Sequence, residues 1–343
     1  MNCPFDPAIP MYHPCTAILV DDDESFLRSL RKALGCENAV LAFSSTGKAL
    51  KYIHQAQNFA DNAFNLLRPY RFGQEDTGPG DNIVLLESSR VRDFAGSADR
   101  YKIVSVVIID QVMPSITGLE FCSLIRDTGV KIILLTGKMT DQATIEAFND
   151  GLIDRYVNKN DRDARNKIKR MMAELHREYL VEKLNPLIQA FRASRNHMFD
   201  RYATKELMDN VYGVFKFTEY HYLPYPRGFL LSDDEGRKKI CLLGSEQEQM
   251  ERADMIEDEL GPNQNAVKLR SGAFMAWELH DDFGDGRQWT DCLDELLFPC
   301  QRLGEVRWSL FPVEEAPFRN RINHSPWKAY RQELLSIPLN YAV

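Results

Sequence analysis

The amino-acid sequence predicts an α/β protein. A doubly wound, five-stranded parallel sheet is expected first, then a long connecting helix, then an α+β domain with an antiparallel sheet. Three observations support this. Short apolar segments alternate with helical segments from residue 17 to about residue 159, as in a parallel sheet covered on both faces. Residues 161–184 contain neither Gly nor Pro and have helical periodicity. After residue 195, short strands are joined by turn residues.

The five strands of the parallel sheet are short and almost entirely apolar, which is typical of strands buried on both faces. We expect them at residues 17–20, 39–43, 104–109, 131–135 and 154–157. Helices are expected between the strands, because acidic or N-capping residues precede apolar residues at helical spacing. These helices are predicted at residues 25–30, 119–126 and 141–149.

The chain of 343 residues suits two domains of ordinary size. We predict an amino-terminal arm at residues 1–14, the parallel-sheet domain at 15–162, the connecting helix at 163–195 and the α+β output domain at 196–343. An insert of about residues 55–102 interrupts the first domain between its second helix and its third strand.

The insert shows no recognisable chemistry. Its middle, residues 73–81, is rich in Gly, Glu, Asp and Pro, which indicates a loop. Residues 64–67 are expected to extend the second helix, and residues 83–86 to form a strand or a short helix. The insert is therefore either a structural elaboration or a docking surface for a partner.

The composition predicts a globular cytoplasmic protein, with 44% hydrophobic and 27% charged residues. Its longest apolar run, residues 104–109, is far shorter than the roughly 20 residues that a membrane span needs. The first residues lack the features of a signal peptide. The seven cysteines have no metal-knuckle spacing and are expected to be reduced. We expect no zinc site and no contact with a membrane.

The formal net charge of −8 lies entirely in the predicted output domain. Residues 196–343 contain 17 Lys and Arg against 25 Asp and Glu, whereas residues 1–195 contain 25 of each. DNA binding relies on cationic side chains that displace counterions. The acidic output domain therefore argues against DNA as a partner.

Polar residues follow the carboxyl ends of the predicted strands, where ligands bind in doubly wound sheets. They are Asp21, Asp22 and Asp23 after the first strand, Asp110 after the third, Thr136 after the fourth and Lys159 after the fifth. Taken alone, the three aspartates could be an acidic helix start favoured by the helix dipole. Asp23 is expected to be a helix cap.

Clustered carboxylates need a cation, because two of them about 4 Å apart repel by roughly 4 kcal/mol at an effective dielectric constant near 20. A hard divalent ion such as Mg²⁺ suits an all-oxygen site. The ion could also bridge a phosphoryl group, while a hydroxyl and an ammonium bind the remaining phosphate oxygens. The set as a whole predicts Mg²⁺-dependent phosphoryl chemistry.

These residues and their order resemble the receiver domain of two-component response regulators over roughly residues 15–162. The resemblance rests on four motifs that occur in the family's order. They are Ile18-Leu19-Val20-Asp21-Asp22-Asp23, Ile109-Asp110-Gln111-Val112-Met113-Pro114 with Gly118, Leu135-Thr136-Gly137, and Asp154-Arg155-Tyr156-Val157-Asn158-Lys159.

The resemblance implies a role for each matched residue. Asp110 would accept the phosphoryl group from a sensor histidine kinase or another phosphodonor. Thr136 and Lys159 would bind phosphate oxygens. Thr136 and Tyr156 would form the switch pair that alters the face of the fourth strand, fourth helix and fifth strand, although Tyr156 alone could be a core ring. Mg²⁺ would be bound by Asp21, Asp22, Asp110 and the backbone carbonyl of Val112.

Two features depart from the family's pattern. Asn160 follows Lys159 where the family usually has Pro, often after a cis bond. A cis bond before another residue costs roughly 2.5–4 kcal/mol, so the conformation of this bond and the placement of Lys159 stay open. Val112 and Lys138 occupy the two positions that tune phosphoryl lifetime in the family. Because Val112 cannot orient an attacking water, we expect at most slow self-dephosphorylation.

The connecting helix is predicted to be amphipathic, since its apolar residues recur at three- and four-residue steps. Pro186 is expected to bend or restart it. Its apolar face could pack on the chain's own output domain or pair with a second copy, and we expect a homodimer. The apolar residues concerned are Ile168, Met171, Met172, Leu175, Tyr179 and Leu180.

The output domain is expected to mix short strands and helices. Strands are predicted at residues 214–223, 228–232, 239–243 and 305–313, and helices at residues 246–260, 289–303 and 325–335. The domain contains no sequence motif of nucleotide, hydrolase or zinc-protease sites. Residues 280–286 are acidic, but their spacing fits no EF-hand and indicates a solvated turn.

We therefore expect a response regulator that is not an enzyme. Its phosphorylation would switch dimerisation or the interactions of the output domain with another protein or a small ligand. Two alternatives stay open: a receiver coupled to an output enzyme acting on nucleotides, and a divergent DNA-binding transcriptional regulator. The organisation of the chain also resembles the quorum-sensing response regulators of Legionella-type bacteria.

Overall fold

The computed structural model divides the chain into two compact units. The parallel-sheet unit comprises His13–Asn65, Ala98–Gln189 and Pro326–Val343, and the antiparallel-sheet unit comprises Met1–Tyr12, Leu66–Ser97 and Ala190–Ser325. The structure describes residues 3–70, 83–86, 88–137, 142–193, 201–279, 287–316 and 326–340.

This division differs from the predicted domain limits at both ends of the chain and in the insert. Most of the predicted arm and the middle of the insert belong to the antiparallel-sheet unit, whereas the last residues belong to the parallel-sheet unit. The predicted limits followed the local periodicity of the sequence, which cannot show that a terminal segment packs against a distant part of the chain.

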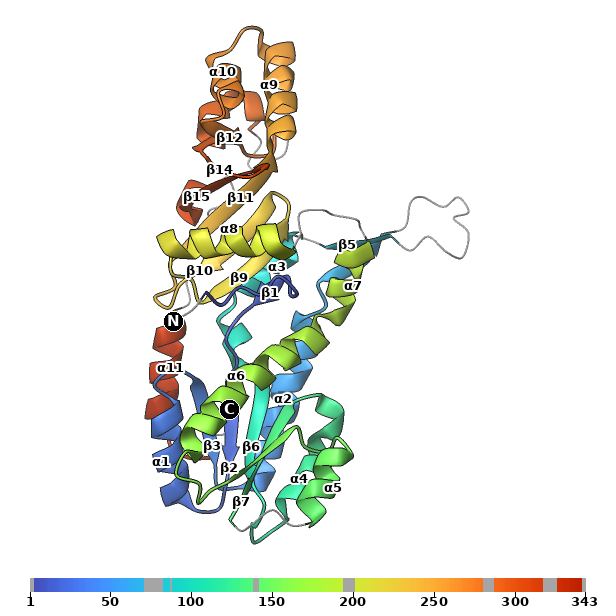
Figure 1. Ribbon diagram of the computed structural model, residues 1–343, viewed down its shortest axis with the longest axis vertical. Helices are drawn as coiled ribbons and strands as arrows, with labels where there is room; N and C mark the ends of the chain where they lie inside the picture. Colours follow the sequence, from blue (N-terminus) through green and yellow to red (C-terminus); the bar gives the residue numbers. More distant parts are fainter. Residues whose placement is uncertain are drawn as a thin grey trace. The chain divides into compact units, whose positions relative to one another are not determined.

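The parallel sheet has the predicted fold (Figure 1). Its five strands are β2 (Thr16–Val20), β3 (Ala39–Phe43), β6 (Val104–Asp110), β7 (Lys131–Thr136) and β8 (Arg155–Asn158). All pair in parallel, in the order β3-β2-β6-β7-β8. The strand order reverses between β2 and β6, so a ligand site is expected beyond the carboxyl ends of these two strands.

Helices cover both faces of this sheet, and alternate residues of each strand point to opposite faces. One face packs against α1 (Glu24–Leu34) and α6 (Ala164–Lys183). The other packs against α2 (Thr46–Ala63), α4 (Gly118–Ile125) and α5 (Gln142–Asn149). As expected, Asp23 caps α1, because its carboxylate accepts hydrogen bonds from the backbone amides of Ser25 and Phe26. Asp141, the first residue of the helix predicted at residues 141–149, lies outside the described residues.

The insert forms a hairpin and a helix. Strands β4 (Leu67–Tyr70) and β5 (Ile83–Leu86) pair antiparallel, followed by α3 (Ser88–Gly96) and a 3₁₀ helix, η1 (Ala98–Lys102). The expected extension of α2 over residues 64–67 is wrong, because α2 ends at Ala63 and Leu67 already begins β4. The loop predicted at residues 73–81 lies outside the described residues.

The connecting helix consists of α6 and α7 (Asn185–Ala193), with the restart at Pro186 that the sequence predicts. The apolar face of α6 is buried in its own unit, where Ile168, Met172 and Leu175 belong to the core of the parallel sheet. This face is therefore covered, which argues against the expectation that it pairs with a second copy.

A six-stranded sheet organises the antiparallel-sheet unit, with the order β1-β9-β10-β11-β15-β14. These strands are β1 (Met11–Tyr12), β9 (Glu219–Pro224), β10 (Arg227–Ser232), β11 (Lys238–Ser245), β15 (Val306–Pro312) and β14 (Gln301–Leu303). A two-stranded sheet pairs β12 (Phe274–Ala276) with β13 (Leu297–Pro299). Besides α3, the antiparallel-sheet unit contains the helices α8 (Arg201–Val214), α9 (Glu246–Leu260) and α10 (Gln264–Arg270).

Two predictions for this unit are wrong. Residues 214–218 are not part of a strand, because α8 continues to Val214 and β9 starts at Glu219. The helix predicted at residues 289–303 is instead two short 3₁₀ helices, η4 (Trp289–Asp291) and η5 (Leu293–Leu296), followed by β13 and β14. There Phe298 stacks on Phe311 with ring centroids 3.7 Å apart. Packing of this aromatic pair favours extended backbone over the helix. Residues 280–286 lie outside the described residues.

The carboxyl-terminal segment returns to the parallel-sheet unit as α11 (Trp327–Ser336), after a 3₁₀ helix, η6 (Val313–Glu315), in the other unit. Trp327 and Leu334 are part of the core beneath α2 and α4, and the Trp327 ring lies 5.0 Å from that of Tyr101. In Figure 1, α11 is drawn in red beside the blue α1 and β3. Across the described part of the chain, every helix is too short or too polar to span a membrane.

Candidate phosphoacceptor site

The acidic cluster lies where β2 and β6 end side by side. Asp21 and Asp22 follow β2 directly, and Asp110 is the last residue of β6. Because these strands are neighbours in a parallel sheet, their carboxyl ends meet at one edge. One carboxylate oxygen from each of the three residues lies within 4.8 Å of the other two. Asp21 and Asp110 are buried, and Asp22 is exposed.

Lys159 brings a positive charge into this cluster. Its Nζ lies 2.5 Å from Asp21 Oδ2 and 2.9 Å from Asp110 Oδ1, and it stands 4.5 Å from the centroid of the Phe26 ring. The backbone amide of Lys159 donates to the carbonyl of Thr136 over 2.8 Å, which fixes the loop after β8 against the end of β7. The predicted Lys159 therefore reaches the predicted Asp110.

Burial and charge compete at this site. Burial raises the pKa of Asp21, while hydrogen bonds from Lys159 and from the Asp23 amide partly offset that increase. Burial would lower the pKa of Lys159, but its hydrogen bonds to Asp21 and Asp110 outweigh burial and raise the pKa overall. The ammonium is therefore firmly charged at neutral pH, and it stabilises two carboxylates that would otherwise repel each other.

The structure shows the conformation of the Lys159–Asn160 peptide bond, which the sequence left open. Among the described residues the one cis peptide bond is Tyr225–Pro226, so the Lys159–Asn160 bond is trans. The Asn160 side-chain amide donates to the Gly137 carbonyl over 2.8 Å, and its backbone amide donates to Asn158 Oδ1 over 2.8 Å. These two bonds hold the loop where the family has Pro, and the departure does not displace Lys159.

Gly118 allows the backbone to fold closely behind Asp110. A Cβ atom at Gly118 would lie 2.4 Å from the Asp110 carbonyl oxygen and 2.9 Å from Gln111 Cα, which is too close for any side chain. The Gly118 amide also donates to the Gln111 carbonyl over 3.0 Å. Position 118 in the second motif therefore requires glycine, because any side chain would collide with the backbone of Asp110 and Gln111.

The predicted switch residues lie on the two strands beyond Asp110. Thr136 ends β7 and is buried. Tyr156, on β8, is 37% exposed, and its ring packs edge-on against Phe148 with the centroids 6.0 Å apart. Tyr156 is therefore not a core ring. The side chain of Val112 is 74% exposed.

The donor set fits Mg²⁺. All the side-chain donors are carboxylate oxygens, which Mg²⁺ prefers, and the ligands of an octahedral site with bonds of about 2.1 Å lie at most about 4.2 Å apart. The three carboxylate oxygens lie within 4.8 Å of one another, which is close to that limit, and exposed Asp22 can turn to adjust its distance. Asp21, Asp22 and Asp110 form the one such cluster found in the described part of the chain.

One residue beside the site was missed by the sequence reasoning. The Asn340 side-chain oxygen accepts hydrogen bonds from the backbone amides of Ser44 (2.8 Å) and Ser45 (3.0 Å), just beyond the end of β3. Phe43 precedes Ser44, and its backbone carbonyl accepts a hydrogen bond from the backbone amide of Asp21 over 3.2 Å. The carboxyl-terminal segment therefore supports the flank of the acidic cluster. Nothing in the local sequence around Asn340 indicates this contact.

The comparisons with known proteins agree with this geometry. Residues 82–173 match the family model "Response regulator receiver domain". The chain therefore carries a receiver domain. The matched range includes Asp110, Thr136, Tyr156 and Lys159, whereas Asp21 and Asp22 precede it on the other side of the insert.

Among solved structures, the Legionella pneumophila response regulator LqsR matches most of the chain. It is 23% identical, covers 89% of each chain and has a TM-score of 0.58, which supports the fold. An adenylate cyclase from Rhodopirellula baltica (22% identity, 52% of this chain and 98% of that one, TM-score 0.34) is also similar. So is a receiver domain protein from Methanospirillum hungatei (18%, 48% and 99%, TM-score 0.31). No curated protein matches the chain.

Proposed function

We propose that Asp110 accepts a phosphoryl group from a sensor histidine kinase or another phosphodonor, and that this modification switches the association of the protein with a second copy or with an output partner. One observation carries the proposal. A buried aspartate at the end of the central strand lies 2.9 Å from a lysine ammonium and beside two further carboxylates. This combination is suited to phosphoryl transfer, because positive charge must stabilise the transferred group.

In the proposed reaction, an oxygen of the Asp110 carboxylate attacks the phosphorus atom of the donor. The bond between phosphorus and the donor's leaving atom breaks, and Asp110 becomes an acyl phosphate. The Lys159 ammonium, already directed at Asp110, moves to a phosphoryl oxygen, and the Thr136 hydroxyl binds another. Buried surroundings strengthen both contacts relative to water.

A bound Mg²⁺ would supply the positive charge that brings the donor phosphate close to three carboxylates. Asp21, Asp22 and Asp110 would hold it, together with the backbone carbonyl of Val112. The side chain of Val112 is a hydrocarbon and lies largely in solvent, so it cannot orient a water molecule for hydrolysis. Slow self-dephosphorylation follows from this. Lys138, the second tuning position, lies outside the described residues.

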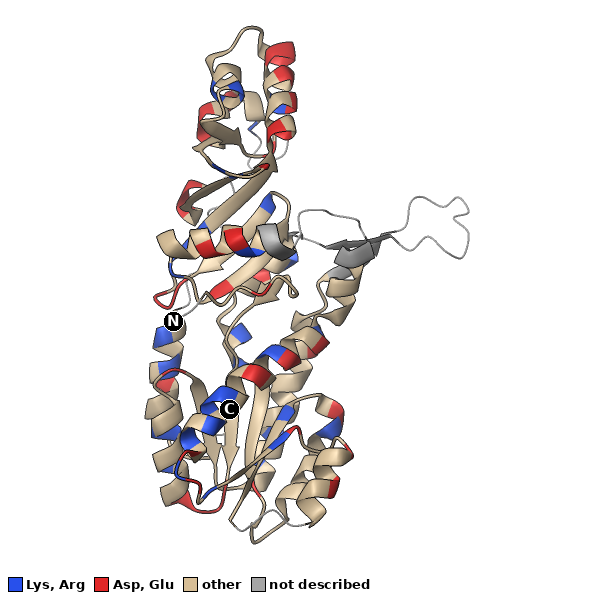
Figure 2. Ribbon diagram, in the orientation of Figure 1, with Lys and Arg blue, Asp and Glu red and all other residues tan. Residues whose placement is uncertain are grey.

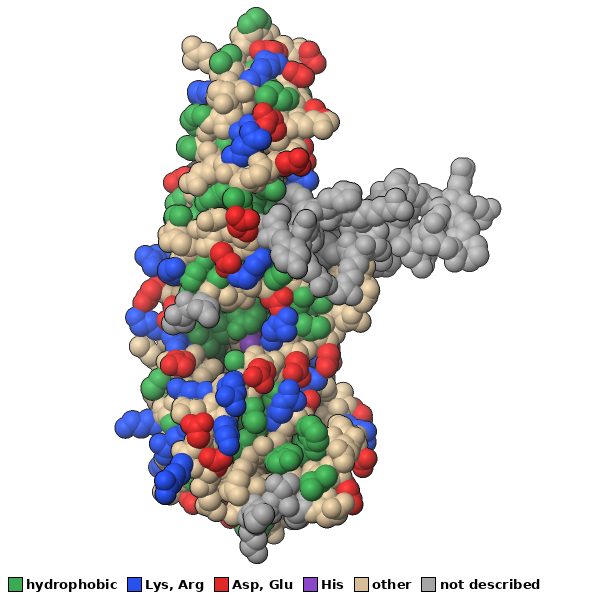
Figure 3. Space-filling model, viewed as in Figure 1, with side chains coloured by type: hydrophobic (Ala, Val, Ile, Leu, Met, Phe, Trp, Pro, Cys, Tyr) green, Lys and Arg blue, Asp and Glu red, His purple; other side chains and the backbone are tan. Residues whose placement is uncertain are grey.

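The switch would act on the surface formed by α5 and β8. Three large apolar side chains are exposed there, namely Ile145 (40%), Phe148 (42%) and Tyr156 (37%). In Figure 3, hydrophobic side chains gather over the region of α4 and α5. When Thr136 binds the phosphoryl group, the Tyr156 ring would move inward and leave Phe148, which changes the shape of this surface. A homodimer formed through this surface is the proposed output, and a second protein or a small ligand is the alternative occupant.

The experiment is a measurement of solution mass by light scattering, with and without Mg²⁺ and beryllofluoride. The expected result is a doubling of mass in the wild type on addition of the phosphoryl mimic, and no change in Asp110→Asn. Phe148→Ser is the matched surface variant. It should bind beryllofluoride but stay monomeric. If the wild-type mass does not change although beryllofluoride binds, dimerisation is not the output, and partners of the altered surface must be sought instead.

A further inference from the structure

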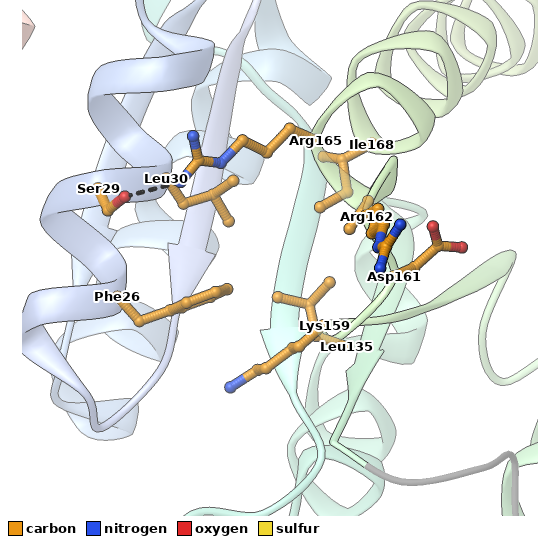
Figure 4. Close-up of a pocket in the computed structure, with 10 residues that line it drawn as sticks. Phe26, Ser29, Leu30, Leu135, Lys159, Asp161, Arg162, Arg165 and Ile168 are labelled. Carbon is orange, nitrogen blue, oxygen red and sulfur yellow. Dashed lines mark hydrogen bonds between the residues drawn. The ribbon is translucent and has the colours of Figure 1, made fainter.

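A second site of different chemistry lies in the parallel-sheet unit, between α1 and the first turns of α6 (Figure 4). It is a cavity of about 320 Å³. Its apolar lining comes from three elements: Phe26 and Leu30 of α1, Leu135 of β7 and Ile168 of α6. This volume is at the lower end of the range of small-molecule sites, which are concave, mostly apolar and carry a few polar groups.

Two arginines border the cavity, and neither has a carboxylate partner in the described part of the chain. Arg162 and Arg165 both line it and are exposed, and within the described residues neither guanidinium forms an ion pair. Figure 4 shows Arg165 extending from α6 to Ser29 on α1, to which it donates a hydrogen bond over 3.1 Å. These two positive charges are therefore available to a ligand.

The other charged groups at the cavity are already neutralised. Lys159 also lines it, but its ammonium is bound to Asp21 and Asp110. The single lining carboxylate, Asp161, pairs with Lys167. Lys and Arg residues are frequent along this part of α6 in Figure 2. The cavity therefore combines a partly apolar lining with two positive charges at its border that no described carboxylate pairs with.

We propose that this cavity binds a small amphiphilic anion, with an apolar body and one carboxylate or other oxyanion group. The body would contact Phe26 and Leu30, and the anionic group would accept hydrogen bonds from Arg162 and Arg165. Guanidinium groups suit oxyanions, because they offer parallel N–H donors and charge-assisted hydrogen bonds. An occupant would also touch the side of Lys159 that faces away from Asp110. Binding itself does not depend on phosphorylation of Asp110.

The test uses octanoate as the anion, the fluorescent sulfonate 8-anilinonaphthalene-1-sulfonate as the reporter, and octanol as the neutral control, with the full chain. Octanoate should displace the reporter at a concentration about tenfold lower than octanol, because only octanoate can bind the arginines. The double variant Arg162→Gln/Arg165→Gln should lose that difference. Arg170→Gln, an exposed arginine farther along α6, should retain it.

A second variant tests whether octanoate binds in the cavity, by filling the cavity with a larger side chain. Ser29 is exposed on α1 and lines the cavity, so Ser29→Phe should fill it without disturbing the core and should prevent displacement by octanoate. Melting temperatures of all variants confirm that they are folded. The proposal is overturned if octanoate fails to displace the reporter from the wild type. It is equally overturned if octanoate binds the double variant and Ser29→Phe as tightly as the wild type.

Discussion

Replacing Lys159 by Met should lower the stability of the protein, because the Lys159 ammonium neutralises the carboxylates of the acidic cluster. The substitution keeps most of the side-chain length but removes the charge that lies 2.5 Å from Asp21 and 2.9 Å from Asp110. Both carboxylates are buried, so they cannot regain the interaction from water. At an effective dielectric constant near 20, one contact of 2.9 Å is worth about 6 kcal/mol before the cost of desolvation is subtracted. Removing one partner of a buried ion pair typically costs about 3–5 kcal/mol.

The expected loss of unfolding free energy for Lys159→Met is therefore about 3–5 kcal/mol in EDTA. Urea unfolding followed by circular dichroism measures it. Mg²⁺ should restore more stability to the variant than to the wild type, because the ammonium no longer competes with the metal for the same carboxylates. Lys167→Met is the control. It breaks an ion pair with Asp161 whose two side chains are partly exposed (39% for Lys167 and 32% for Asp161), and it should cost less than about 1 kcal/mol. A Lys159→Met protein as stable as the wild type in EDTA would refute this account of the cluster.

Three further predictions concern the parallel-sheet unit. Asn340→Ala leaves two backbone amides without their side-chain acceptor and should lower the unfolding free energy by about 1–3 kcal/mol, whereas an unchanged urea midpoint would contradict that contact. Gly118→Ala should displace the backbone behind Asp110 and slow phosphorylation by acetyl phosphate, and a wild-type rate would count against the close approach. His176 is buried, and burial lowers its pKa from 6.5 to about 4. As pH falls from 6.5 to about 4, the unfolded chain gains a proton that the folded protein excludes, so stability should fall by about 3 kcal/mol. His176→Gln should show a shallower decrease over that range, and equal slopes would exclude this residue as the cause.

The parallel sheet and its acidic cluster could be predicted because both depend on local sequence. Most of the strands are continuous apolar runs bounded by polar residues, as in β3. The ends of β2, β6 and β8 set the positions of Asp21, Asp110 and Lys159, respectively. Once the strand order is known, these side chains must meet at one edge of the sheet. The close contact of Lys159 with both aspartates confirms that reasoning.

The parts that could not be predicted depend on contacts between distant segments. The helix at Trp327 was expected, but its docking against Tyr101 in the core of the parallel-sheet unit was not, because periodicity does not specify a partner. The same is true of β1, whose two residues pair with β9. Residues 289–303 have helical composition, yet stacking of Phe298 on Phe311 accompanies an extended conformation. Asn160 departs from the family's pattern, and only the structure shows the hydrogen bond to Gly137 that holds its loop.

The most direct test of the proposed function is intact-mass analysis after incubation with acetyl phosphate, with Mg²⁺ or with EDTA. The wild type should gain a single phosphoryl group in Mg²⁺ and none in EDTA, and peptide mapping after borohydride reduction should place it on Asp110. Asp110→Asn should gain none under either condition. A phosphoryl group at another residue, or equal modification of Asp110→Asn, would contradict the assignment of Asp110 as the phosphoacceptor.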